Sequence, residues 1–258
     1  MFTFETIFIF ATLLGFSLSI GSFVGMASYR IPQKINLGKT EYPFVLGGRS
    51  RCPHCDQDLR NRDLIPILSF LLLKGKCFFC NKKISSRYLL IELAACACFL
   101  TCVLASNDNL VRIILFFFLV GLLLLSTIDI EHGLLPDQIT LPLLWVGLVV
   151  NLHLELVPLS AAVLGATLGY TSLWLLFWIY KFLRDKEAFG YGDFKLLAAT
   201  GAWFGFQALP NTLLYASITG LMWALLKGFI EKGAIRSIPF GPFISLGIVI
   251  YILSSNSL

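Results

Sequence analysis

The sequence predicts an all-α fold, a polytopic membrane protein of about eight transmembrane helices with one small soluble loop domain. Hydrophobic residues make up 57% of the chain and charged residues only 14%, whereas charged residues come to about 25% of an ordinary soluble domain. The mean hydropathy is +0.81, and the apolar residues are concentrated in long runs. These observations exclude an ordinary soluble domain.

Eight apolar runs follow one another along the chain, most of them near the ~20 residues that a spanning helix needs. They lie at 4–27, 89–106, 110–128, 139–156, 159–180, 195–209, 212–230 and 238–254. The first run has no Lys or Arg before Arg30, so it lacks the basic segment that opens a cleavable signal peptide. We therefore expect it to remain as a helix.

Lys and Arg are distributed unevenly, and twelve of the twenty lie between Arg30 and Arg87. These residues resist translocation and accumulate in cytoplasmic loops. With this loop in the cytoplasm, only Arg112 falls on the outer side, so the termini are predicted to be external and the net charge of +5 mostly reflects topology. A nucleic-acid partner is not expected, because Asp56 and Asp58 interrupt the basic residues and no regular aromatic platform accompanies them.

The long loop carries two Cys-x-x-Cys pairs, Cys52 with Cys55 and Cys77 with Cys80. The 21 residues between the pairs suit a tetrahedral four-thiolate zinc site, although the usual gap is roughly 15 to 20. A thioredoxin-like redox pair would need a βαβ context, and a reducing cytoplasm would not keep two disulfides. We predict that the four cysteines bind Zn2+, which supplies much of the loop's folding energy. His54 could replace a ligand but is better interpreted as a solvated loop residue.

Two aspartates, Asp129 and Asp193, lie at the edges of apolar runs. A carboxylate near lipid is costly unless it pairs, faces a water-filled cavity or does chemistry, so each is a candidate functional residue. Structural alternatives remain for both: Asp193 could be the N-cap of the sixth helix, and Asp129 a solvated residue just past the third. Asp137, after Pro136, is interpreted as the cap of the fourth helix. The predicted topology places Asp129 and Asp193 on the same, cytoplasmic face.

Two carboxylates on one face can form an acid/base pair. When they approach closely they do not both ionise easily, so they share a proton. One can then act as base on a bridging water while the other donates to a carbonyl oxygen, as in aspartic proteases. Gly190 and Gly192 precede Asp193 and are expected to free the backbone for an unusual turn. This pattern favours an active-site loop over a plain helix cap.

Several short motifs occur in a characteristic order along the chain. They are Gly21-Ser22-Phe23, Tyr29-Arg30-Ile31-Pro32, Ser50-Arg51-Cys52-Pro53-His54-Cys55, Ile65-Pro66-Ile67-Leu68-Ser69, Lys74-Gly75-Lys76-Cys77, Arg87-Tyr88 with Glu92, the segment from Asp129 to Asp137 ending in Leu-Pro-Asp, and Gly190-x-Gly192-Asp193. In these motifs the sequence resembles the bacterial type IV prepilin peptidases, also called prepilin leader peptidases and N-methyltransferases, over essentially its full length.

The resemblance implies an intramembrane aspartic endopeptidase of the bacterial inner membrane, with Asp129 and Asp193 as the catalytic pair. Such enzymes remove the short basic leader of type IV prepilins and of pseudopilins on the cytoplasmic side. The implied organisation is a first transmembrane helix over 1–28, a cytoplasmic four-cysteine zinc-binding loop over 29–88, and a peptidase helical bundle over 89–258. Besides the pilin substrates, membrane lipid is an expected partner.

The resemblance also implies that the enzyme methylates the new amino terminus with S-adenosylmethionine. No Gly-x-Gly-x-x-Gly motif follows a strand, so a Rossmann-type cofactor domain is not supported. The family pattern associates methyl transfer with the zinc-bearing loop, where Gly75 corresponds to the glycine just before the third cysteine. Gly75 could equally be a turn residue.

Two other classes of protein remain as alternatives. A proton-coupled transporter would also place aspartates in membrane helices, but it would favour the midplane and often show inverted repeats, which are not found here. A non-catalytic assembly factor that docks through the zinc loop would explain the cysteines and leave the aspartates unexplained. Cleavage of a prepilin that depends on both aspartates would distinguish the peptidase from both.

Overall fold

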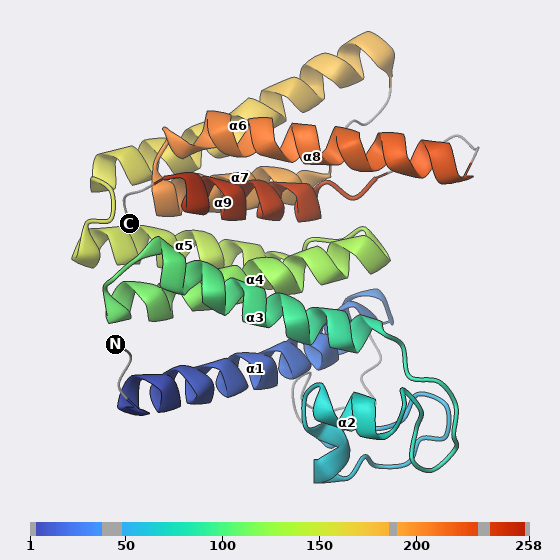
Figure 1. Ribbon diagram of the computed structural model, residues 1–258. Coiled ribbons are helices and arrows are strands. Elements are labelled where there is room, and N and C mark those ends of the chain that lie inside the picture. Colours follow the sequence, from blue (N-terminus) through green and yellow to red (C-terminus); the bar gives the residue numbers. More distant parts are fainter. Residues whose placement is uncertain (1–3, 38–47, 186–189, 232–237, 256–258) are drawn as a thin grey trace. The chain divides into compact units, whose positions relative to one another are not determined.

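The computed structural model describes residues 4–37, 48–185, 190–231 and 238–255, and within them the chain is helical, without β-strands (Figure 1). The helices are α1 (Phe4–Leu37), the 3-10 helix η1 (Asn61–Leu64), α2 (Leu68–Leu72), α3 (Arg87–Ala105), α4 (Asn109–His132), α5 (Asp137–Leu154), α6 (Leu159–Arg184), α7 (Tyr191–Phe204), α8 (Ala208–Glu231) and α9 (Gly241–Ser254). Lys186, Lys232 and Arg236, which contribute to the predicted orientation, lie outside the described residues.

Six of these helices are long and apolar enough to cross a membrane, namely α1 over Phe10–Gln33, α3, α4, α5, α6 and α8. The predicted all-α membrane fold is therefore confirmed. The sixth and eighth predicted runs correspond to α7 and α9, which have 14 residues each. Fourteen residues are fewer than the ~20 that a spanning helix needs.

The chain divides into two compact units, of which the first comprises Met1–Val103 and Leu115–Leu124. In this unit α1 packs closely on α3. A Cβ added at Gly21 would lie 2.7 Å from Glu92 Cα and 2.9 Å from Ala95 Cβ, and the rings of Phe10 and Phe99 are 5.6 Å apart. The absence of a side chain at Gly21 lets the two backbones approach, as is common between membrane helices.

The second unit, Leu104–Ile114 with Leu125–Leu258, is built around α7, which contacts α5, α6, α8 and α9 (Figure 1). Every residue of α7 from Phe194 to Phe204 is buried except Lys195. Asn151 of α5 donates from Nδ2 to the carbonyl oxygen of Ala202 at 2.8 Å. Because α7 is covered by protein rather than lipid, its position is set by packing and by buried hydrogen bonds.

Helices α6 and α7 touch through their backbones. A Cβ added at Gly201 of α7 would overlap the carbonyl group of Gly165 of α6, and one added at Gly169 would lie 2.6 Å from the carbonyl oxygen of Leu197. Backbone atoms do not rotate away as side-chain ends do, so these glycines fix the spacing of the two helices.

Gly201→Ala is expected to push α6 and α7 apart and to destabilise the protein by roughly 1–3 kcal/mol, the usual cost of overpacking a core. The midpoint of thermal unfolding in detergent would measure it. Gly228→Ala is the matched control, because a Cβ at Gly228 in α8 meets nothing within 4 Å. Alanine favours a helix by about 1 kcal/mol over glycine, so the control should melt no lower than the parent. Equal midpoints for both variants would contradict the prediction.

Candidate active site and metal centre

Asp129 lies one turn before the end of α4, and its side chain is buried in the second unit. The neighbouring Leu125 and Ile128 are fully buried, and Asp129 itself is 6% exposed. The helix ends because Gly133 adopts a left-handed conformation, φ 61°, from which its N–H donates to the Asp129 carbonyl at 2.9 Å. The side-chain carboxylate of Asp129 accepts a buried hydrogen bond at Oδ2 from the backbone N–H of Gly241, at 3.0 Å. Asp129 is therefore not a solvated residue past the helix.

Asp193 occupies the third position of α7 and is 5% exposed. Its Oδ2 accepts a hydrogen bond from the backbone N–H of Gly190 at 3.1 Å, and Gly190, not Asp193, is the N-cap. Among the residues that the structure describes, Oδ1 of Asp193 is buried without a hydrogen-bond partner. A buried polar atom without a partner is costly, so this oxygen is suited to bind a proton, a water or a substrate group.

The structure brings the two aspartates into one site. Leu135 lies beside both acids: its side chain packs on Gly192, next to Asp193, and on Gly241, whose N–H binds Asp129. A Cβ added at Gly192, beside Asp193, would overlap Leu135, and one at Gly241, which binds Asp129, would lie 3.2 Å from Leu135 Cδ2. Two buried carboxylates that approach closely can share one proton, as acid/base hydrolysis needs, and the shared contact with Leu135 makes these two aspartates the candidate pair.

The two glycines before Asp193 have a different role from the predicted one. Gly190 has φ −78° and ψ 148°, an extended conformation that any residue adopts, so no unusual turn requires it. Gly192 is required because Leu135 occupies the space of its missing side chain. The glycine serves close packing between the α4–α5 connection and α7, which the sequence alone could not indicate.

Asp137 does not act as the predicted cap of its helix. Pro136 is the N-cap of α5 and Asp137 is the first residue of the helix. The Asp137 carboxylate instead accepts a hydrogen bond from Nζ of Lys195 in α7 and forms an ion pair with it. This ion pair joins the first turns of α5 and α7 at the protein surface.

The two cysteine pairs of the first unit form matching turns. In the first, the N–H of Asp56 donates to the Cys52 carbonyl at 2.9 Å; in the second, the N–H of Asn81 donates to the Cys77 carbonyl at 3.0 Å. Asp56 and Asn81 both have positive φ, 53° and 56°, a conformation that Asp and Asn tolerate better than most residues. The two turns bring both pairs of thiols together.

The four thiol sulfurs of Cys52, Cys55, Cys77 and Cys80 lie within 4.8 Å of one another. The sulfurs of Cys52 and Cys80 are 3.9 Å apart. Tetrahedral zinc with Zn–S bonds of about 2.3 Å requires sulfurs roughly 3.8 Å apart, so the cluster can hold such an ion. His54 is exposed and lies outside the cluster.

Hydrogen bonding in the cluster favours the thiolate form of Cys52, whereas the pKa of the neighbouring Cys55 thiol is raised to about 11. Burial raises the pKa of the Cys52 thiol, but hydrogen bonds from the backbone of His54 and Cys55 outweigh it and lower the pKa to about 7. Since a metal ligand must be a thiolate, this environment suits metal binding.

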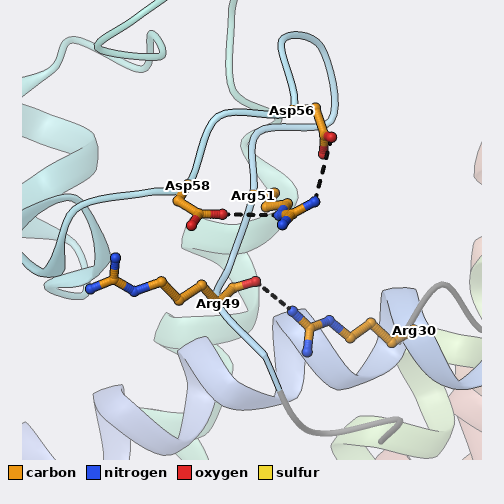
Figure 2. Close-up of polar contacts among 5 residues, drawn as sticks. All are labelled: Arg30, Arg49, Arg51, Asp56 and Asp58. Carbon is orange, nitrogen blue, oxygen red and sulfur yellow. Dashed lines mark hydrogen bonds and ion pairs between the residues drawn. The ribbon is translucent and has the colours of Figure 1, made fainter. Parts of the chain in front are cut away.

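Two arginines, Arg51 and Arg30, form polar contacts with the loop that carries the cysteines. The guanidinium of Arg51 pairs with Asp58 at 2.9 Å and with Asp56 at 3.5 Å, and Arg30 of α1 donates to the carbonyl of Arg49 at 3.1 Å (Figure 2). The first pair closes the turn of Cys52 and Cys55, and the last bond ties the loop to the first helix. Because these ion pairs are half exposed, each contributes little to stability by itself.

Arg60 was not identified from the sequence, yet it connects η1 to the second cysteine turn. Its guanidinium lies 3.3 Å from the ring centroid of Phe78 and forms two hydrogen bonds with Asp63, at 2.9 and 2.8 Å. The hydrogen bond from Arg60 lowers the pKa of Asp63. Stacking and bidentate pairing together use the planar guanidinium in a way that lysine could not reproduce.

Gly75 and Glu92 both lie where the loop is anchored. Gly75 has φ 66°, and a Cβ there would lie 3.1 Å from Phe70, so the turn alone accounts for a glycine. Glu92 of α3 is 7% exposed and accepts a hydrogen bond from the N–H of Ile67 at 2.8 Å. Ile67 has φ 58°, unfavourable for a β-branched residue, and the buried carboxylate helps to hold it there.

The fold and these sites define a multi-pass membrane protein with a buried carboxylate pair and a four-cysteine cluster. The model of the type IV leader peptidase family matches residues 116–225, and that of the bacterial peptidase A24 N-terminal domain matches residues 15–106. The chain belongs to the type IV leader peptidase family, and the predicted peptidase class is confirmed.

Relatives named prepilin leader peptidase/N-methyltransferase align along nearly the whole chain. One from Dickeya chrysanthemi is 42% identical over 99% of this chain and 97% of its own length. A relative from Dichelobacter nodosus is 39% identical over 90% of this chain and 86% of its own length. One from Aeromonas hydrophila is 40% identical over 96% of this chain and 92% of its own length. No solved structure matches.

Proposed function

We propose that the protein is an intramembrane aspartic endopeptidase that removes the leader of type IV prepilins and pseudopilins, with Asp129 and Asp193 as its catalytic residues. The observation that carries the proposal is the pair of buried carboxylates, each exposed by 6% or less, in one site at the ends of α4 and α7. A buried carboxylate pair in a membrane protein needs a functional reason, and the names of the relatives supply the substrate class.

The proposed reaction is hydrolysis of one peptide bond by water. The ionised carboxylate takes a proton from water as its oxygen attacks the scissile carbonyl carbon, and the protonated carboxyl donates its proton to the carbonyl oxygen. Collapse of the tetrahedral intermediate breaks the C–N bond, and the departing nitrogen receives a proton. The products are a leader with a new carboxylate and a shortened pilin with a new amine.

We also propose that the enzyme methylates this new amine. S-adenosylmethionine would supply the methyl group: the amine nitrogen bonds to the methyl carbon as the carbon–sulfur bond breaks, the sulfonium becomes a neutral thioether, and the amine loses a proton. Cys52, Cys55, Cys77 and Cys80 would hold a structural Zn2+ that orders the loop, and Gly75 is the proposed cofactor-binding position. The names of the relatives support this second activity.

The proposed location is the bacterial inner membrane, with the active site and the zinc loop facing the cytoplasm. The distribution of Lys and Arg supports this orientation, because basic residues resist translocation. A basic leader, retained in the cytoplasm for the same reason, would then meet the site directly. Residues 1–28, 29–88 and 89–258 are the proposed first helix, zinc loop and peptidase bundle.

Incubating the purified protein with a prepilin tests the proposal. We expect a shorter product whose new amino terminus, located by mass spectrometry, follows the leader, and whose formation requires both Asp129 and Asp193. A product that is 14 Da heavier when S-adenosylmethionine is added would support methyl transfer. Ion-dependent flux in vesicles without any cleavage would overturn the peptidase and favour a transporter.

A further inference from the structure

The first turn of α9 directs one backbone donor at Asp129. Helix N-termini leave their first N–H groups without partners inside the helix. In α9 the second residue is Pro242, which has no N–H, and the N–H groups of Phe243 and Ile244 both bond to the Phe240 carbonyl at 3.1 Å. The N–H of Gly241 is thus the donor that remains, and it binds Oδ2 of Asp129 at 3.0 Å.

The Gly241 N–H stabilises the Asp129 carboxylate at an unfavourable position in α4. Asp129 lies in the last turn of α4, where the negative end of the helix dipole disfavours a carboxylate, whereas the N-terminus of α9 presents the positive end of another helix. A hydrogen bond to a charged group stabilises more than one between neutral groups. The start of α9 therefore compensates both the burial of Asp129 and its unfavourable place in its own helix.

A side chain at position 241 would crowd the Asp129 carboxylate. A Cβ added at Gly241 would lie 2.7 Å from Oδ2 of Asp129, and 3.2 and 3.3 Å from the two methyl carbons of Leu135. The closest of these atoms is the free end of a side chain, which can move more easily than backbone. A substitution at Gly241 would therefore displace the carboxylate of Asp129 before it disturbed the helix.

We infer that Gly241 is a positioning residue of the peptidase, holding the Asp129 carboxylate in its reactive place through its N–H and its lack of a side chain. This inference rests on the proposed function, because it matters only if Asp129 is catalytic. Misplacing a reacting group by about 1 Å can cost roughly 10²-fold in rate. Because the contact acts on the carboxylate that is proposed to react, we expect the loss to appear in kcat and to leave KM unchanged.

The test compares Gly241→Ala with Gly247→Ala in purified enzyme acting on a prepilin. A Cβ at Gly247 in the same helix would lie 2.6 Å from the carbonyl oxygen of Thr212, so that variant reports packing of α9 alone. We expect Gly241→Ala to lower kcat about 10²-fold, with KM within roughly two-fold of the parent. Gly247→Ala should lower the melting temperature while its folded fraction keeps the parent kcat.

A double variant separates positioning from crowding. Leu135→Ala removes the methyl groups that a Cβ at Gly241 would crowd, so Leu135→Ala/Gly241→Ala is expected to fold even if Gly241→Ala does not. Its kcat should remain low relative to Leu135→Ala alone. A parent-like kcat in Gly241→Ala, or recovery of kcat in the double variant, would overturn the inference and leave the proposed function standing. Normal cleavage by Asp129→Asn would overturn both.

Discussion

Asp129→Asn and Asp193→Asn should each abolish leader removal while leaving membrane insertion intact. Asparagine keeps the shape of aspartate but neither takes a proton from water nor donates one to the carbonyl oxygen as a carboxylic acid does. Acid/base groups contribute about 10²–10⁴-fold to a rate. In the proposed mechanism the two acids act as a unit, so the double variant should be little worse than either single one.

The measurement is single-turnover cleavage of a prepilin by enzyme purified from membranes in equal amounts. Asp137→Asn is the matched control, because Asp137 belongs to the same α4–α5 segment and is exposed, and it pairs with Lys195. An exposed ion pair is worth about 1 kcal/mol or less, so that variant should cleave at nearly the parent rate. Unimpaired processing by either Asp129→Asn or Asp193→Asn would refute the role of that residue.

Removal of the metal should unfold the cysteine loop and leave the peptidase bundle folded. Zn2+ binding to four thiolates contributes apparent free energies of about 10–16 kcal/mol in small zinc domains, more than a loop of this size could gain from its own core. The loop buries few apolar side chains: in α2, Leu71 is 62% and Leu72 81% exposed. Cys55→Ser, or treatment with a chelator, should therefore open this segment to protease and stop methyl transfer.

Three measurements on one preparation check this prediction. They are the zinc content per chain, the rate of tryptic cleavage within the loop, and the ratio of methylated to unmethylated product. Cys98→Ser is the control, because Cys98 lies in α3 outside the four-cysteine cluster. It should keep one zinc per chain and a protected loop. Full zinc binding by Cys55→Ser would contradict the four-ligand site.

Local patterns were enough to predict the apolar helices and to select the candidate residues of both sites. Runs of apolar residues reveal helices because burial in lipid depends on composition, and a Cys-x-x-Cys pair carries its own turn geometry, as Cys52 with Asp56 shows. Asp129 and Asp193 could be selected because a charge at the edge of an apolar run is rare. Each of these signals lies within a few residues of the position it identifies.

The contacts that support the sites join distant parts of the chain, and no local pattern predicts them. Gly241 is 112 residues from Asp129, and Lys195 is 58 residues from Asp137. For that reason the sequence suggested a helix cap at Asp137 and an unusual turn at Gly190, where the structure has an ion pair and ordinary extended backbone. Arg60 was missed similarly, since its stacking partner Phe78 comes from the other cysteine turn.

The length of α7 bears on how water would reach the peptide bond that the proposed intramembrane peptidase cuts. A helix of 14 residues is about 21 Å long, roughly 9 Å less than a hydrocarbon layer of about 30 Å. Since α5, α6, α8 and α9 pack around α7, we do not expect the bilayer to thin to match it. The last residue of α7, Phe204, is apolar, whereas Asp193 lies in its first turn. We therefore expect the Asp193 end of the helix to stop short of the membrane surface. The proposed hydrolysis would then take place at this end of α7, below the lipid headgroups.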